Sequence, residues 1–121
     1  MLFRSNALKK ARKDFNRKYP LYIGNKEVRK DKELPSFNPS KPSEIVGMVS
    51  MATTDDAERA INEAKTALNE WRTRPPADRA SFLFKAALET RKKRFELAAL
   101  EVCEVGKSWK EADGDIVEAI D

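Results

Sequence analysis

Few residues of this chain have the type and spacing that chemistry at a site requires. Cys103 is the single cysteine, and the sequence contains no histidine. A thiol becomes a good nucleophile when a neighbouring base or cation favours the thiolate, and no imidazole is present to do this. Zinc sites built from cysteine and histidine are therefore excluded, as are Cys–His and Ser–His–Asp catalytic units within these 121 residues. We predict that Cys103 is a small buried hydrophobic residue of a helix.

One short segment resembles the end of a phosphate-binding loop. Gly106, Lys107 and Ser108 follow one another as in a P-loop, but the position of the earlier glycine is occupied by Glu101. The segment also follows a predicted helix, whereas a P-loop follows a strand. We interpret Gly106 as a left-handed helix cap and Ser108 as the start of the next helix.

Acidic and aromatic residues of the second half have simple structural interpretations. A hard cation could be suggested by six acids, namely Glu101, Glu104, Glu111, Asp113, Asp115 and Glu118. Helical spacing spreads them around polar faces, so we predict that they are solvated. Trp71 and Trp109 are interpreted as packing anchors because no exposed aromatic residues are interleaved with them. We therefore assign no catalytic, cofactor-binding or metal-binding residue.

The net charge of +4 conceals an uneven distribution. Residues 1–30 contain ten Lys/Arg and two Asp/Glu, whereas residues 31–121 contain fourteen Lys/Arg and eighteen Asp/Glu. Such a basic start can bind nucleic acid or acidic lipid, and its cations include Lys9, Lys10, Arg12 and Lys13. We favour the simpler interpretation of a solvated helix face. The letters LFRS correspond to the translation of a sequencing-adapter end, so no functional argument rests on residues 1–5.

The compartment is predicted from two features of the sequence. A lone cysteine cannot form an intrachain disulfide, which fits a reducing compartment, and we expect a cytoplasmic protein. No apolar run approaches the roughly 18–20 residues that a membrane-spanning helix needs. We therefore expect neither membrane nor nucleic-acid partners.

The first half of the chain predicts one helix and several short strands. A helix is expected over Ala7–Lys18, ended by Pro20, so that residues 1–19 form a basic N-terminal arm. Residues 21–28 predict a hairpin whose Gly24–Asn25 turn takes positive φ. After a polar connection over Asp31–Pro35, we expect a strand entering a turn at Asn38–Pro39 and a fourth strand over Glu44–Met51.

The second half predicts four helices. Thr53 and the two acids that follow Thr54 are typical of a helix start. We predict one buried face on the first of these helices, made of Ala57, Ile61, Ala64, Leu68 and Trp71. Pro75–Pro76 opens the second helix, whose apolar stripe is Leu83, Phe84, Ala87 and Leu88. The third spans Phe95–Val105, and the fourth follows Ser108 with a stripe of Ala112, Ile116, Ala119 and Ile120.

The last stripe is still running at Asp121, with no capping residue after it. An apolar stripe needs a surface to bury against. We therefore expect that surface to belong to a longer chain, of which these residues are an N-terminal fragment with an incomplete α+β fold.

The order of these segments resembles the N-terminal part of the aldehyde dehydrogenase superfamily. A hairpin, an Asn-Pro turn with a second strand pair, TTDDAERAINEAKTALNEW and PPADRASFLFKAALETRKKRFELAAL follow in that order. The stretch EVCEVGKSWKEADGDIVEAID and the start ALKKARKDFNRKYPLYIGNKEV are most similar to the 1-pyrroline-5-carboxylate (L-glutamate γ-semialdehyde) dehydrogenases of that superfamily. The resemblance extends from about Ala7 to the last residue.

This resemblance implies an α/β enzyme with a Rossmann-type cofactor domain, to which residues 20–121 contribute. It implies NAD-dependent oxidation of L-glutamate γ-semialdehyde to glutamate in proline degradation. A cysteine thiolate attacks the aldehyde, hydride passes to NAD, and water hydrolyses the thioester. Family members are several times longer, usually homo-oligomeric, and carry these catalytic and cofactor residues beyond the position of Asp121. Cys103 is not the family's nucleophile, so the chain alone is expected to be inactive.

One further resemblance and two rival hypotheses remain open. Glu104, with backbone near Phe37, is similar to a structural monovalent-cation position of some family members, although a helix-end glutamate explains it equally well. The chain is alternatively a stand-alone basic helical module that binds nucleic acid or acidic surfaces. A third hypothesis is a short structural subunit that assembles with a full-length dehydrogenase. The sequence distinguishes neither NAD from NADP nor one aldehyde substrate from another.

Overall fold

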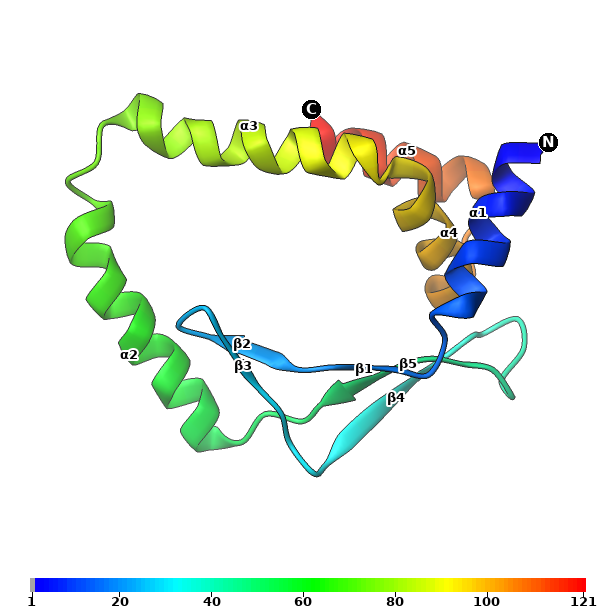
Figure 1. Cartoon of the computed structure of the whole chain (residues 1–121), viewed down its shortest axis with the longest axis horizontal. Helices are drawn as coiled ribbons and strands as arrows, with labels where there is room; N and C mark the ends of the chain where they lie inside the picture. Colours follow the sequence, from blue (N-terminus) through cyan, green and yellow to red (C-terminus); the bar gives the residue numbers. More distant parts are fainter. Residues whose placement is uncertain (1) are drawn as a thin grey trace.

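The computed structural model describes residues 2–121 and has an α+β architecture (Figure 1). Its elements in chain order are α1 (Leu2–Lys13), β1 (Arg17–Tyr19), β2 (Leu21–Ile23), β3 (Lys26–Val28), β4 (Glu33–Phe37), β5 (Ile45–Ser50), α2 (Thr54–Trp71), α3 (Pro76–Lys92), α4 (Arg94–Val105) and α5 (Trp109–Ile120). The expected order of strands followed by four helices is confirmed.

The strands form two small sheets. One has the order β1-β5-β4, with β1 parallel and β4 antiparallel to β5. The other is the β2–β3 hairpin, in which Leu21 faces Val28. Its turn residues Gly24 and Asn25 have φ of 57° and 59°, which confirms the predicted turn with positive φ at both positions.

The prediction of a helix over Ala7–Lys18 is wrong in its second half. Helix α1 ends at Lys13, and Asn16 takes a left-handed conformation with φ of 62°. The Asn16 amide then donates to the carbonyl of Ile45 at 3.2 Å, and β1 pairs along β5. A partner 30 residues away in sequence therefore overrides the local helical pattern, and the sheets have five strands rather than four.

The polar connection predicted over Asp31–Pro35 is also wrong in part, because β4 begins at Glu33. Pro35 lies within this strand, opposite Met48 of β5. Proline has no amide hydrogen to donate, but β4 is one of the two edge strands of its sheet, where that loss is tolerated.

Helix boundaries follow their capping residues. The Thr53 hydroxyl accepts from the Asp56 amide while the Asp56 carboxylate accepts from the Thr53 amide, which forms a capping box at the start of α2. Pro76 occupies the first position of α3, as predicted. Gly106 ends α4 in the left-handed conformation, with φ of 76°.

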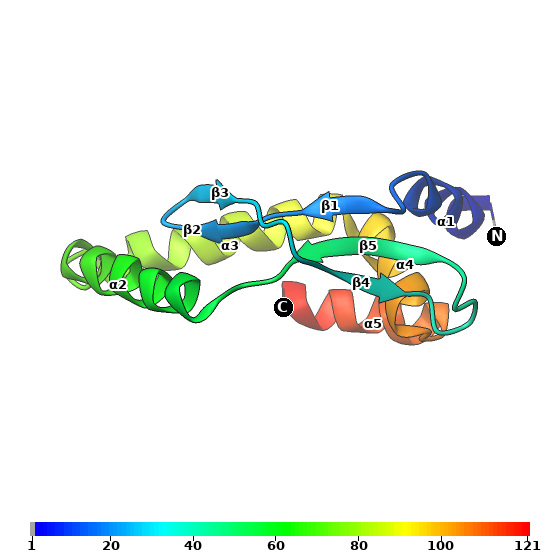
Figure 2. The same cartoon turned by 90° about the horizontal axis from the view of Figure 1, so that it is seen from below.

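The buried core is small and lies where α1, α4 and α5 meet each other and the sheet (Figures 1 and 2). Its helical members are Ala7, Ala98, Ala99, Cys103 and Ala112, and its strand member is Val46 of β5. Ile23 is buried separately, in the β2–β3 hairpin beside α2. Alanines at the helix contacts allow close approach of the backbones. No large side chain of residues 3–121 is completely buried.

The face predicted to be buried on α2 and the apolar stripe predicted on α3 are largely exposed in this structure. On α2, Ile61, Leu68 and Trp71 are 54%, 52% and 40% exposed. On α3, Leu83 and Phe84 are 73% and 69% exposed. Helix α3 runs beside α5 and joins α4 at its C-terminal end, whereas α2 lies at the far end of an arch and contacts strand β2 of the hairpin (Figure 1). The spacing identified the apolar faces correctly; within the described residues α5 contacts part of the α3 stripe, but the large side chains of both faces stay mostly exposed.

Candidate functional site

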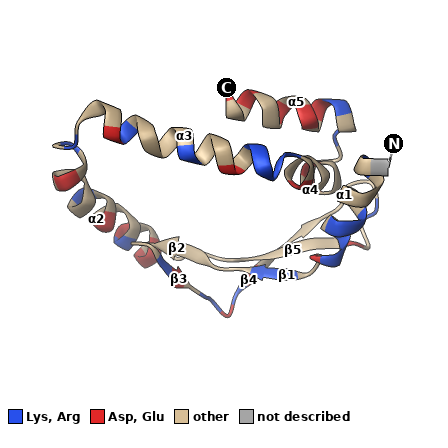
Figure 3. Cartoon of the chain, turned by 45° about the horizontal axis from the view of Figure 1, so that its top comes forward, with Lys and Arg blue, Asp and Glu red and all other residues tan. Residues whose placement is uncertain are grey.

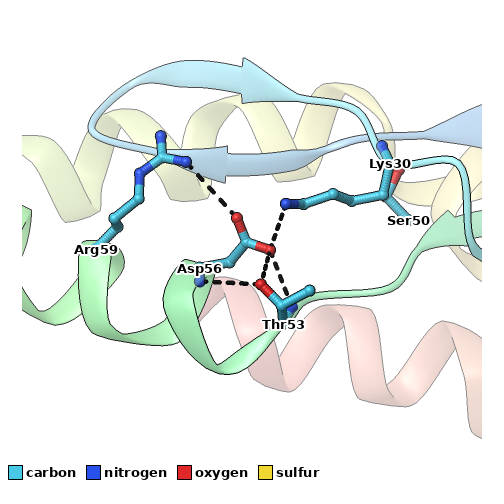
Figure 4. Close-up of polar contacts among 5 residues, drawn as sticks. All are labelled: Lys30, Ser50, Thr53, Asp56 and Arg59. Atoms are coloured by element: carbon cyan, nitrogen blue, oxygen red, sulfur yellow. Dashed lines mark hydrogen bonds and ion pairs between the residues drawn. The ribbon is translucent and has the colours of Figure 1, made fainter.

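The most buried ionised group of the described residues is the carboxylate of Asp56, at the start of α2. Its side chain is only 2% exposed. The Lys30 ammonium, from the connection after β3, lies 2.6 Å from Asp56 Oδ2 (Figure 4). The same oxygen accepts from the backbone N–H of Thr53 at 2.9 Å and from its hydroxyl at 2.7 Å. Arg59, one turn along α2, approaches Oδ1 at 3.7 Å.

This arrangement holds Asp56 in its charged form. The Lys30 ammonium, and then the two donors of Thr53, keep the pKa of Asp56 well below its ordinary value of 3.8. A group with so low a pKa does not accept a proton near neutral pH, so it is unsuited to acid–base catalysis. Since the Lys30 amide also faces the hydroxyl of Ser50 in β5 at 3.4 Å, the cluster joins the β3–β4 connection, β5 and α2. These contacts hold the start of α2 against the sheets and provide no group for catalysis.

A second set of ion pairs closes the corner between α4 and α5. Arg94 Nε and Nη2 donate to the two oxygens of Asp113 at 2.6 and 2.8 Å, a bidentate pair that raises the pKa of Arg94 and lowers that of Asp113. Lys107 contacts Asp115 and lies 3.0 Å from Glu101. The bond to Asp115, followed by that to Glu101, raises the pKa of Lys107.

These contacts change the interpretation of the acidic residues. The prediction that they are simply solvated is wrong for Glu101, Asp113 and Asp115, which pair with cations, because the turn at Gly106 folds α5 back along α4. Glu104 is exposed and accepts from the Ser36 hydroxyl at 2.8 Å, next to Phe37. Within residues 2–121 no cluster of three Cys, Asp or Glu side chains has the geometry to hold a metal ion.

The segment Gly106–Ser108 is a helix cap rather than a phosphate loop. The Gly106 amide donates to the carbonyl of Val102, and the Ser108 hydroxyl accepts from the amide of Glu111 to start α5. Lys107, which would contact phosphates in a P-loop, is already held by two carboxylates. Residues Gly106–Ser108 therefore do not form a phosphate-binding loop for a dinucleotide such as NAD.

Cys103 is 2% exposed on the inner side of α4, as predicted. Burial raises the pKa of its thiol above the ordinary value, so the thiolate is disfavoured. In this position the side chain packs as a small apolar group.

The basic residues of α1 face the rest of the molecule as well as solvent. Lys and Arg gather on α1, whereas α5 is mostly acidic (Figure 3). Lys10 pairs with Glu96 of α4, and Arg12 lies 4.0 Å from Glu44. The guanidinium of Arg4 lies 5.8 Å from the ring centre of Trp109. Several cations of the basic N-terminal segment therefore have partners within the chain, so their presence does not require a nucleic-acid or lipid partner.

An apolar hollow of about 520 Å³ lies between the β2–β3 turn, α2 and the start of α3. Its walls are Ala64, Ala67, Leu68, Trp71 and Phe82, and we call it the α2–α3 hollow. The rings of Trp71 and Phe82 pack at 5.4 Å, tilted by 60°, which confirms Trp71 as a packing anchor. At the rim, Arg74 pairs with Glu70 and its guanidinium lies 5.8 Å from the Phe82 ring.

Comparison with known proteins decides the family. A sequence profile of the aldehyde dehydrogenase family matches residues 26–121. The chain belongs to the aldehyde dehydrogenase family. The resemblance deduced from the order of segments is thus confirmed, and no helix within residues 2–121 has the length and apolar character needed to cross a bilayer.

Two bacterial 1-pyrroline-5-carboxylate dehydrogenases illustrate the similarity to curated proteins. The 1-pyrroline-5-carboxylate dehydrogenase of Geobacillus sp. (strain WCH70) is 44% identical over 115 residues, which cover 95% of this chain and 22% of that protein. The 1-pyrroline-5-carboxylate dehydrogenase 2 of Bacillus subtilis is 46% identical over 103 residues, covering 85% and 20%. The chain thus spans about a fifth of the length of these relatives.

Solved aldehyde dehydrogenase structures contain the same arrangement of elements. The structure of 1-pyrroline-5-carboxylate dehydrogenase from Thermus with bound NAD matches with a TM-score of 0.95 at 43% identity, over 98% of this chain and 23% of that one. Betaine aldehyde dehydrogenase from Staphylococcus aureus, in complex with NAD+, matches with a TM-score of 0.81 at 28% identity, over 97% and 23%. The α+β arrangement seen here is a piece of the aldehyde dehydrogenase fold.

Proposed function

We propose that this chain supplies the N-terminal part of an NAD-dependent dehydrogenase that oxidises L-glutamate γ-semialdehyde (1-pyrroline-5-carboxylate) to glutamate in proline degradation. The observation that carries this proposal is identity of 40–46% to bacterial 1-pyrroline-5-carboxylate dehydrogenases over most of the chain. The identity to betaine aldehyde dehydrogenase is lower, at 28%, which favours 1-pyrroline-5-carboxylate dehydrogenase over another aldehyde dehydrogenase activity.

Within that enzyme the residues described here act as a scaffold. Asp56 and Lys30 join α2 to the sheets, and Arg94 with Asp113 holds the α4–α5 corner. We assign no catalytic, cofactor-binding or metal-binding role to them. Contacts to NAD and to the aldehyde belong, in this proposal, to segments that correspond to the other four-fifths of the relatives. The 121-residue chain alone is expected to be inactive.

The remaining parts of the proposal concern organisation. We propose that residues 20–121 belong to the cofactor-binding domain and that residues 1–19 form an N-terminal extension to it. For the whole enzyme we propose a cytoplasmic homo-oligomer that acts on a small aldehyde and on neither nucleic acid nor membrane. The lone, buried Cys103 suits a reducing compartment.

A chimeric enzyme tests the proposed activity. In it, this chain replaces the matching segment of the Geobacillus relative, and NADH formation is followed with L-glutamate γ-semialdehyde and with betaine aldehyde. We expect turnover that favours the semialdehyde as strongly as in the parent relative. The purified 121-residue chain, assayed in parallel, is expected to form no NADH.

Two results would contradict this proposal. One is NADH formation by the isolated chain, since the proposal assigns the NAD contacts to segments outside it. The other is a folded chimera that loses the parent's preference for the semialdehyde. Sequencing the gene beyond codon 121 gives an independent check, because the proposal expects the reading frame of a dehydrogenase to continue there.

A further inference from the structure

Helix α1 is held on α4 by charges more than by apolar burial. Among its described side chains only that of Ala7 is buried. Lys10 pairs with Glu96 of α4, and the Arg12 guanidinium lies 4.0 Å from the Glu44 carboxylate. The side chains of Lys10, Glu96 and Arg12 are 49–63% exposed. Water and salt screen ion pairs of this kind, so the attachment of α1 depends on ionic strength.

The contact between α1 and α4 is also incompletely packed. A cavity of about 140 Å³ remains between α1, β1 and α4, and its walls include Ala11, Tyr19, Leu97 and Leu100. Protein interiors normally fill such space, because side chains next to a void lose dispersion contacts. The apolar attraction that retains α1 is therefore weak.

A turn over residues 14–16 connects α1 to the sheet and provides a hinge. Asn16 in this turn is left-handed, with φ of 62°. From Asn16 onward the chain is fixed, because its amide donates to the carbonyl of Ile45 and β1 pairs along β5. Before the turn, α1 is a helix of 12 residues, a length that is only marginally stable alone. Lys9 and Lys13, four residues apart on this helix, repel each other.

Cys103 lies on the face of α4 that α1 covers. It follows Glu96 by seven residues, which is two helical turns, so the two side chains share one side of α4. Burial raises the pKa of the Cys103 thiol, and the charge of Arg12 on α1 acts in the opposite direction. Helix α1 packs chiefly against α4 and crosses it (Figure 1). Its removal from α4 would therefore expose this thiol.

We propose that α1 is a salt-sensitive lid on α4, which lifts about the turn at residues 14–16 while the sheets and the α4–α5 corner stay folded. Screening of the Lys10–Glu96 and Arg12–Glu44 pairs favours the lifted state. The lifted state differs from global unfolding because the ion pairs of the α4–α5 corner, such as Arg94–Asp113, remain. The inference is independent of the proposed activity, since it uses only contacts within this chain.

Labelling of Cys103 by a maleimide measures how often the lid opens. The rate is measured on the 121-residue chain in 0.1 M and 1 M NaCl, and each value is divided by the rate for the urea-unfolded chain at the same salt concentration. The screening length falls from about 10 Å to about 3 Å over this range. We expect the normalised rate to rise about three- to tenfold. Hydrogen exchange in the same solutions should show loss of protection in α1 and unchanged protection in α5.

Two neighbouring lysines of α1 provide a matched pair of variants. Lys10→Gln removes the ion pair with Glu96, whereas Lys9→Gln removes the same charge from an exposed position. In 0.1 M NaCl we expect Lys10→Gln to label about threefold faster than the native chain, and Lys9→Gln to stay within a factor of about 1.5. The salt effect should be smaller in Lys10→Gln, because one of the two screened pairs is already absent.

Three results would overturn the inference. The first is a labelling rate of Cys103 that does not rise with salt. The second is an equal effect of Lys9→Gln and Lys10→Gln, which would show that net charge matters and the Lys10–Glu96 pair does not. The third is a loss of hydrogen-exchange protection that is as large in α5 as in α1, since the whole chain would then loosen rather than the lid.

Discussion

Asp56 shows how one side chain connects two parts of the molecule. A carboxylate that is 2% exposed requires compensation, and it receives an ammonium at 2.6 Å and two donors from Thr53. The two cations beside it differ in geometry. Lys30 contacts it directly and is 27% exposed, whereas Arg59 lies 3.7 Å away and is 59% exposed.

This difference predicts unequal effects of removing each cation. Lys30→Met leaves a buried carboxylate without its charge partner, while Arg59→Met removes a weak, screened contact. In urea unfolding of the 121-residue chain, we expect Lys30→Met to lower the midpoint urea concentration at least about three times as much as Arg59→Met does. Equal losses would show that the buried ion pair does not anchor α2.

The low pKa of Asp56 also predicts a pH dependence. A group whose pKa is lower in the folded state stabilises the folded state fully above its unfolded pKa. This contribution to the free energy of unfolding is lost as the pH falls toward the folded pKa. The stability difference between the native chain and Asp56→Asn should therefore be constant above about pH 5 and shrink as pH falls below about 4. Urea titrations at a series of pH values measure it. A difference that grows on acidification would contradict the depressed pKa.

At the scale of elements, the turn between α4 and α5 depends on one glycine. Gly106 has φ of 76°, and a Cβ built there would lie 2.8 Å from Cγ of Pro39. Any other residue would meet both the left-handed strain and this contact. Gly114, inside α5, provides a matched control because an added Cβ meets nothing within 4 Å.

Alanine at these two positions should have opposite effects. We expect Gly106→Ala to lower the free energy of unfolding by about 1–2 kcal/mol. Gly114→Ala should raise it by about 0.5–1 kcal/mol, because alanine loses less backbone entropy in a helix. Thermal and urea unfolding measure both changes. Destabilisation by Gly114→Ala would indicate that something packs against α5 at that point.

For the whole molecule, the open arch predicts weak cooperativity. The slope m of urea unfolding is proportional to the surface exposed on unfolding, and this chain already exposes 9324 Å² when folded. We expect m to be about a fifth smaller than for a compact single domain of equal length. A compact domain of about 120 residues, measured under identical conditions, is the control. An equal m would mean that the isolated chain closes its arch in solution.

Local signals predicted much of this structure. The Gly24–Asn25 turn, the Thr53 cap, Pro76 at the first position of α3 and the Gly106 cap are each determined by the conformational preferences of one or two residues. Strand β1 was not predictable in this way. Residues Arg17–Tyr19 carry no distinctive strand pattern, and they become a strand only because β5 lies beside them.

The candidate site was predictable only in part. The caps at Gly106 and Ser108 followed from the sequence, because each depends on neighbours within one or two helical turns. Burial of Cys103 was also expected, from the apolar character of its helix, but it is realised by the packing of α4 against α1 and α5. The Lys30–Asp56 anchor could not be foreseen, since the two residues are 26 positions apart and only the folded chain brings them together. The absence of assigned catalytic residues stays a prediction.

By itself, the sequence determined which residues form turns, caps and apolar helix faces, and its segments identified the aldehyde dehydrogenase family. Those properties are local, or are carried by the order of residues along the chain. Only the tertiary structure decided which apolar faces are covered: Ala112 is buried, whereas Leu68 and Trp71 of α2 are open. Spacing shows that a face is apolar, but burial requires a second surface, and that surface is set by the packing of distant segments.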